Sequence, residues 1–152
     1  MEKVIFRGLY RRKGERTGWN GVPLPSMWKY GGIFPNNKCK KNTFAIIYQQ
    51  DPVVDKFPVY ADTVGMFTGL YDKRENMIFG GDIVKITYAE ADREYTLVEQ
   101  VVYMDKSACF ALMCTCEGEK FYRPFAQLDE HIRIKEIEVI GNIYDDPELL
   151  EE

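Results

Sequence analysis

Histidine is almost missing from this sequence, and long apolar runs are missing altogether. The 152 residues include a single histidine, His131, so a Ser-His-Asp triad or a histidine-rich metal site has almost nothing to be built from. No stretch approaches eighteen uninterrupted apolar residues, so we expect no membrane-spanning helix. The glycine patterns G-x-x-x-x-G-K-[ST] and G-x-G-x-x-G are also absent, which removes the common phosphate-binding and dinucleotide-binding loops.

The first sixteen residues, MEKVIFRGLYRRKGER, contain neither an apolar core nor a cleavage site, so we expect no signal peptide. The four cysteines then indicate reduced, metal-free thiols in the cytoplasm. Two alternatives use these thiols: zinc held by Cys109, Cys114 and Cys116, or a catalytic pair of a cysteine with His131. Structural zinc needs four ligands, and Cys39 lies in a different region, so we favour thiols that pack in the core and an exposed histidine at a strand edge.

The composition is that of a folded, mostly β protein. Hydrophobic residues make up 45% of the chain and aromatic residues 14%, with ten Tyr, nine Phe and two Trp, which is enough apolar surface for one domain of this length. Turn residues recur about every 10–14 positions in the second half, a spacing typical of a β-meander. We expect strands at 3–10, around Trp19, and at 28–34, 43–49, 63–70, 82–90, 94–104, 108–115, 120–125 and 131–144, with a short helical turn from Pro147.

Side-chain alternation places some of these strands within the sheet. Both faces of 108–115 are apolar, so this strand should lie inside the sheet rather than at an edge. The apolar positions of 131–140 slip by one residue near Lys135-Glu136, which indicates a bulge. Most glutamates alternate onto solvated faces and several aspartates fall at turns, so no pair of catalytic acids can be inferred. The predicted core includes Ile83, Val101, Phe110, Leu112 and Val139.

Two segments carry a family resemblance. VGMFTGLYDKRENMIFGGDIVKI (64–86) and EVIGNIYDDPELL (138–150) resemble, in this order and spacing, the YopX family of phage and prophage proteins, and IFRGLYRRKGERTGW (5–19) resembles the family's opening more loosely. The stretch 20–41 does not map onto the family pattern. The resemblance implies an all-β, partly closed fold and a phage accessory gene, and it implies no enzymatic role.

We therefore expect an all-β fold with a minor helix: a curled β-meander that forms a partly open, SH3-like small barrel, with a Gly/Pro-rich β/loop extension at the N-terminus. The chain is interpreted as one domain, 1–152, with a basic, loop-rich part at 1–63 and a barrel-like part at 64–152. In Gly81-Asp82-Ile83-Val84 we expect Asp82 to cap the turn before a buried strand, and we interpret TGLYDK as a turn module rather than a binding loop.

The charge is distributed unevenly along the chain. The net charge is −4, yet residues 1–41 hold ten Lys or Arg against two Glu, a net of +8, which leaves −12 for the remainder. Basic side chains between aromatic ones suit a groove for single-stranded nucleic acid, whereas the acidic remainder favours a protein contact or self-association. A passive solvated surface is the third reading. The candidate binding residues are Arg7, Arg11, Arg12, Lys13, Arg16, Trp19, Lys38, Lys40 and Lys41.

Of the binding alternatives, we favour a protein partner or homo-oligomer over nucleic acid. We expect no enzyme, cofactor, metal, membrane contact or small-molecule substrate.

Overall fold

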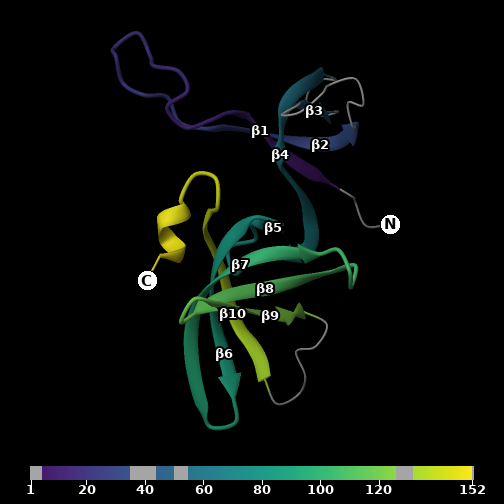
Figure 1. Cartoon of the computed structure of the whole chain (residues 1–152), viewed down its shortest axis with the longest axis vertical. Coiled ribbons are helices and arrows are strands. Elements are labelled where there is room, and N and C mark those ends of the chain that lie inside the picture. Colours follow the sequence, from purple (N-terminus) through teal and green to yellow (C-terminus); the bar gives the residue numbers. More distant parts are fainter. Residues whose placement is uncertain (1–4, 35–43, 50–54, 126–131, 152) are drawn as a thin grey trace. The chain divides into compact units, whose positions relative to one another are not determined.

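The computed structural model describes residues 5–34, 44–49, 55–125 and 132–151, and it confirms the all-β fold (Figure 1). The chain divides into two compact units, unit 1 (Met1–Phe67) and unit 2 (Thr68–Glu152). The described elements are β1 (Phe6–Arg11), β2 (Met27–Phe34), β3 (Phe44–Gln49), β4 (Asp55–Tyr71), β5 (Met77–Phe79), β6 (Asp82–Glu90), β7 (Arg93–Met104), β8 (Cys109–Cys116), β9 (Glu119–Pro124), β10 (Ile132–Asn142) and the 3-10 helix η2 (Pro147–Leu150).

Unit 1 is built on four antiparallel strands. β1 pairs with both β2 and β4, and β3 pairs with β2 and β4, so each strand has two partners within the unit, and β4 also pairs with β5. Among the residues whose burial the structure describes, the buried apolar side chains of this unit are those of Leu9, Ile47 and Val59. The strands pass so close that a Cβ atom on Gly8 would lie 2.5 Å from Cγ2 of Val59. Glycine is therefore required here for space.

β4 is much longer than the sequence predicts. A strand was expected at 63–70 and a polar connection before it, but the strand begins at Asp55 and runs for 17 residues. Pro58 lies inside it, opposite Ile46 of β3, a position that strand propensity argues against. Burial of Val59 and the pairing of this segment with both β3 and β1 outweigh that preference.

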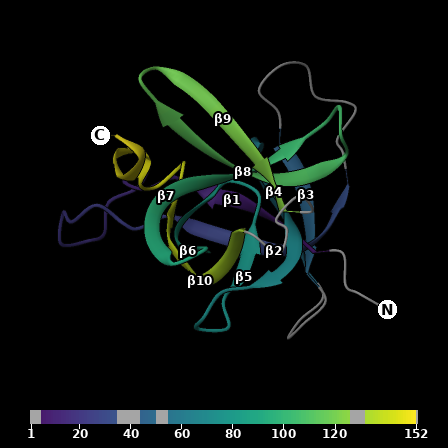
Figure 2. The ribbon, with the colours of Figure 1, turned by 90° about the horizontal axis from the view of Figure 1, so that it is seen from below.

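Unit 2 contains a five-stranded antiparallel sheet in the order β10-β6-β7-β8-β9. The meander from β6 to β9 agrees with the expected strands to within one or two residues, and the strand expected at 131–144 ends at Asn142. The sheet is curled, as the curvature of β7 in Figure 2 shows. β10 and β9, the first and last strands in the order, do not pair with each other within the described residues, so the sheet is not closed into a barrel.

The core of unit 2 lies on the inner face of this sheet. Its fully buried members are Ile78, Val84, Ile86, Tyr88, Val101 and Leu112. Of the five predicted core residues, Ile83, Val101 and Leu112 are buried, as expected. Phe110 and Val139 are only partly buried and pack against the cluster, since Phe110 is the second residue of β8 and Val139 lies on β10, the first strand in the sheet order.

Local features of unit 2 follow their sequence signals. The pairing of β10 with β6 shifts register between Ile134 and Glu136, which confirms the predicted bulge. The turn from β8 to β9 consists of Glu117 and Gly118, both at positive φ, as a two-residue type I′ hairpin requires. The helical turn expected at Pro147 is present as η2.

Candidate functional site

The connection between β1 and β2, residues 12–26, forms an ordered loop, which we call the Trp19 loop (Figure 1). A strand was predicted around Trp19, but only an isolated bridge between Thr17 and Pro23 is present. Backbone hydrogen bonds nevertheless join its two sides, from Gly14 N to Leu24 O (2.9 Å) and from Leu24 N to Arg16 O (2.8 Å). The loop is thus a short hairpin without regular strands.

The tip of this loop is a tight turn that presents Trp19. Gly21 N donates to Gly18 O (2.9 Å) and Gly18 N donates to Val22 O (2.8 Å), which encloses a three-residue turn. Gly21, the third residue of this turn, has φ +78°. Three-residue hairpin turns place their last residue in this left-handed region, which favours glycine. The Asn20 side chain accepts from Val22 N (3.1 Å). Trp19 lies within this turn with its side chain 100% exposed.

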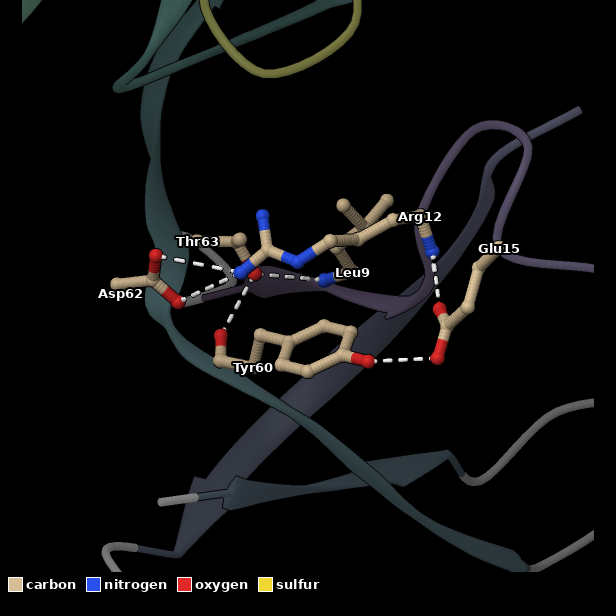
Figure 3. A network of polar contacts seen from close by, with 6 residues as sticks. All are labelled: Leu9, Arg12, Glu15, Tyr60, Asp62 and Thr63. Carbon is tan, nitrogen blue, oxygen red and sulfur yellow. Dashed lines mark hydrogen bonds and ion pairs between the residues drawn. The ribbon is translucent and has the colours of Figure 1, made fainter. Parts of the chain in front are cut away.

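The base of the loop is fastened to β4 by polar contacts (Figure 3). The Glu15 carboxylate accepts from Arg12 N (2.7 Å) and from the Tyr60 hydroxyl (2.7 Å). The Arg12 guanidinium pairs with Asp62 (3.3 Å) and lies over the Tyr60 ring, 4.2 Å from its centroid. The hydrogen bond from Tyr60, and then that from Arg12 N, hold the pKa of Glu15 below its usual value, while Glu15 raises the pKa of Tyr60.

The Thr63 side chain replaces a backbone hydrogen bond that is missing between β1 and β4. The register between β1 and β4 shifts between Arg7 and Leu9, which interrupts the ladder of backbone hydrogen bonds. The Thr63 hydroxyl accepts from Leu9 N (2.9 Å) and donates to Tyr60 O (2.6 Å), as Figure 3 shows. A buried N–H that the shift would leave unpaired is therefore satisfied by a side chain.

Three of the predicted cationic residues are engaged within unit 1. Arg7 is buried, and its guanidinium lies 4.7 Å from the centroid of the Trp28 ring. Arg11 donates to Pro25 O from Nε (3.2 Å) and Nη2 (3.0 Å), and Arg12 is held by Asp62 and Tyr60 as described above. These contacts tie the three residues to the strands and to the base of the loop.

The remaining candidates divide into two groups. Lys13 and Arg16 are exposed, and their side chains form no ion pair with any residue that the structure describes. Together with Trp19 they make the available surface of the loop. Lys38, Lys40 and Lys41 lie outside the described residues. A groove that follows a nucleic-acid backbone uses several free cations, and the described part of the loop offers two.

Unit 2 contains a buried polar cluster that the sequence reasoning missed. Most glutamates were expected on solvated faces and Glu99 was not singled out, but it is 2% exposed on the inner face of β7. The Tyr88 hydroxyl donates to its Oε1 (2.6 Å), and the Arg123 guanidinium lies 4.5 Å from the centre of the Tyr88 ring. The alternation of Leu97, Glu99 and Val101 on β7 was the signal that could have placed Glu99 inside.

Burial sets the electrostatics of this cluster. It raises the pKa of Glu99 above the usual glutamate value, more than the Tyr88 hydrogen bond and the Arg123 charge lower it. Burial and then the hydrogen bond to Glu99 likewise raise the pKa of Tyr88 far above its normal range. Burial also raises the pKa of Cys114, which disfavours the reactive thiolate. In all three groups burial is the main cause of the raised pKa, as is typical of side chains in a protein core.

The other candidate chemistry finds little support. Cys109 and Cys114 are half-buried free thiols on opposite faces of β8, and Cys116 is an exposed one. Within the described ranges, no three His, Cys, Asp or Glu side chains are grouped as metal ligands would be. His131 and Cys39 are outside those ranges.

The motifs behind the family resemblance hold turns in place. The Asp72 carboxylate accepts from Arg74 N (2.9 Å), Asn76 N (2.8 Å) and, across the sheet, Val139 N (3.0 Å). Asp82 accepts from Phe79 N (2.7 Å), which confirms its predicted role as a turn cap. In the C-terminal motif the Asn142 side chain accepts from the backbone N–H groups of the two residues at 144 and 145. These side chains of the shared motifs therefore have a structural role.

A family model described as YopX protein matches residues 24–151. The match begins at Leu24, so it includes most of the stretch 20–41 that was not expected to map onto the family, while the segment 5–19 and most of the Trp19 loop precede it. No curated protein matches the chain significantly. None of the described residues form a helix long and apolar enough to cross a membrane. Because the family model covers most of the sequence, this chain belongs to the YopX family.

Proposed function

We propose that this chain is a non-catalytic accessory protein of a phage or prophage, which acts in the host cytoplasm by binding another protein or a second copy of itself through the Trp19 loop. The carrying observation is the fully exposed indole of Trp19 at the tip of a hydrogen-bonded turn. The phage context is what the YopX resemblance implies. The absence of an enzymatic role remains part of the proposal.

The energetics of protein interfaces support a contact of this kind. Tryptophan is enriched among the few side chains that dominate binding free energy, because it buries a large apolar area with few rotatable bonds. The Glu15 and Asn20 hydrogen bonds fix the loop before a partner arrives. Less conformational entropy is then lost on binding.

Binding of single-stranded nucleic acid is the second candidate. It is favoured by the exposed cations of Lys13 and Arg16 beside an aromatic ring on which a base could stack. If only these two cations neutralised phosphates, the logarithm of the affinity would fall with the logarithm of salt concentration at a slope of about −1.4. Protein contact is preferred because Arg7, Arg11 and Arg12 are already engaged.

A comparison of two variants tests the proposal. Full-length protein would be used to capture partners from induced host cells, and the affinity for each purified partner would be measured by calorimetry. Trp19→Ala should weaken binding by at least about 2 kcal/mol, whereas Val98→Ala, at another exposed apolar residue, should have no effect. Equal affinity of both variants and the wild type would contradict the proposal. Trp19-dependent binding of oligonucleotides, with the stated salt slope, would support the second candidate instead.

A further inference from the structure

The β8–β9 hairpin of unit 2 exposes a surface whose chemistry complements the Trp19 loop. β9 is the last strand in its sheet, so one of its edges has no strand partner among the described residues. Phe121 is 51% exposed and Tyr122 is 49% exposed, on the two opposite faces of this edge. Glu117 in the turn and Glu119 at the start of the strand are exposed as well.

This edge is unusual for a protein that stays monomeric. Edge strands are commonly shielded by charge, proline or a covering segment, because their free backbone groups and apolar side chains invite association. Lys120 and Pro124 give β9 some of that protection. The two half-exposed aromatic rings are nevertheless an apolar contact area of the kind found at interfaces.

The charges of the two units are opposite. Unit 1 contains eleven Lys or Arg and five Asp or Glu, a net of +6, whereas unit 2 contains nine and nineteen, a net of −10. Several acidic side chains of unit 2 already pair with cations of the same unit: Glu90, Glu94, Glu136 and Glu138. Glu117 and Glu119 have no such partner within the described residues, and neither do Lys13 and Arg16 of the Trp19 loop.

From these observations we infer that the partner of the Trp19 loop is a second copy of this chain, which is contacted at its β8–β9 edge. This inference rests on the proposed function and names its partner. Trp19 packs against Phe121 of the other copy, and Lys13 and Arg16 face the carboxylates of Glu117 and Glu119. Aromatic packing supplies the stability of the contact, and the opposite charges supply its orientation and its sensitivity to salt.

Two different surfaces meet in such a contact, which has consequences for assembly. A contact between unlike surfaces can repeat from copy to copy, or two copies can exchange it reciprocally around a two-fold axis. In either arrangement, a chain with a substitution in the Trp19 loop can still bind through its β8–β9 edge, and the reverse also holds. Variants of the two surfaces should therefore complement each other when mixed.

Analytical ultracentrifugation of the full chain provides the first test. We expect association that strengthens with protein concentration and weakens with salt. Trp19→Ala and Phe121→Ala should each raise the dissociation constant about 30-fold, and charge reversal by Arg16→Glu or Glu117→Lys should raise it less. The control variants Val98→Ala and Lys106→Glu, which change an exposed apolar residue and an exposed cation elsewhere on unit 2, should leave it unchanged.

Mixing and fluorescence provide the second test. An equimolar mixture of Trp19→Ala and Phe121→Ala should form mixed dimers at a protein concentration that is too low for either variant to associate alone. In a Trp28→Phe background Trp19 is the sole tryptophan, so its emission should shift to shorter wavelength as the protein concentration rises. An emission maximum that is already short and independent of concentration would mean that Trp19 is covered within one chain, and it would overturn the inference.

Two further outcomes would overturn it. One is a chain that stays monomeric at high concentration and low salt. The other is association that neither Trp19→Ala nor Phe121→Ala weakens. Neither result decides whether the loop binds a different protein, because the capture experiment with Trp19→Ala tests the proposed function separately.

Discussion

The two units of this chain use different means to hold their strands. In unit 2, six fully buried apolar or aromatic side chains form one cluster with eight partly buried neighbours. Among the described residues of unit 1, the corresponding cluster is formed by Ile47 and Val59 with three partly buried neighbours. Its strands are also joined by cation–aromatic contacts, such as Lys29 over the Phe57 ring at 4.0 Å, and by polar contacts such as that of Thr63.

The contacts of the two units have different consequences: those of unit 2 stabilise the fold, and those of unit 1 set the conformation of the Trp19 loop. Burial of apolar area is the dominant favourable contribution to folding, so the buried cluster is the main source of stability in unit 2. In unit 1, polar contacts fix the direction in which the Trp19 loop leaves the strands. A region that presents a binding loop needs a defined conformation more than a large core.

Truncation of one leucine in each core should have the largest effect. Leu112→Ala in unit 2 and Leu9→Ala in unit 1 remove fully buried side chains, and each should cost about 3 kcal/mol. Urea unfolding followed by circular dichroism measures both. If the chain is one cooperative domain, as the sequence predicts, both variants shift a single transition. Two transitions, each moved by one variant only, would show that the units unfold independently.

Removal of the Asp72 carboxylate should destabilise unit 2 strongly. Burial raises the pKa of Asp72, but the hydrogen bonds from Val139, Asn76 and Arg74 outweigh it and lower the pKa. Stability from this group is therefore present above the usual aspartate pKa and lost as pH falls through the lower folded value. Asp72→Ala should cost about 2 kcal/mol at neutral pH, with a smaller cost in strong acid. A cost independent of pH would contradict the role of the charged form.

Gly8→Ala, which adds a methyl group, should test how closely β1 packs against Val59 of β4. The added Cβ would lie 2.5 Å from Cγ2 and 2.8 Å from Cβ of Val59, so the strands must separate. Gly8→Ala should cost about 1–3 kcal/mol in thermal unfolding. If the clash is the cause, Gly8→Ala should cost less in a Val59→Ala background than in the wild type. An equal cost in both backgrounds would point to a backbone effect instead.

Glu99→Gln should reverse the usual cost of a core substitution. The folded pKa of Glu99 is raised, so the stability from this group is complete below the ordinary glutamate pKa and is lost as pH rises through the folded value. Glutamine mimics the protonated form, so the variant should be more stable than wild type at pH 7, with the gain shrinking towards about pH 4. Lower stability of the variant at pH 7 would mean that attraction to Arg123 outweighs burial.

Of these variants, Tyr60→Phe should change the free energy of unfolding least, but it should make the Trp19 loop open more often. It removes the hydrogen bond to Glu15 at an exposed site, so unfolding should change by less than about 1 kcal/mol. The loop should open more often, and trypsin should cleave after Lys13 and Arg16 faster than in wild type. Unchanged cleavage would show that the backbone hydrogen bonds of the loop suffice to hold it.

The sequence predicted the regions in which local signals and tertiary structure agree. The strands from β6 to β9 follow from turn residues and alternation, and the bulge near Glu136 follows from a slip in the apolar pattern. The first half of β4 was missed because Pro58 argues against a strand that tertiary pairing imposes. Glu99 was misplaced because a carboxylate is rarely buried, although its position in the alternation points inward.

The binding role of the candidate residues stays a prediction, and the structure shows where the described ones lie. Trp19, Lys13 and Arg16 were selected from composition, and the structure brings them together on one ordered loop. Arg7 and Arg11 were selected on the same grounds, but Arg7 is buried and Arg11 is hydrogen-bonded to Pro25 at the base of the loop. Sequence alone could not separate these groups, because the distinction depends on the Trp28 ring and the Pro25 carbonyl that the fold supplies.

The continuity of β4 limits how this protein can be divided or recombined. The boundary between the units falls between Phe67 and Thr68, inside a single strand rather than in a linker. On one side of the boundary Phe67 N donates to Ile5 O, and on the other the Thr68 hydroxyl donates to Ile78 O. A gene fusion or recombination joint placed there would interrupt hydrogen-bonded backbone, so insertions should be tolerated in the turns and the two units should be inherited together.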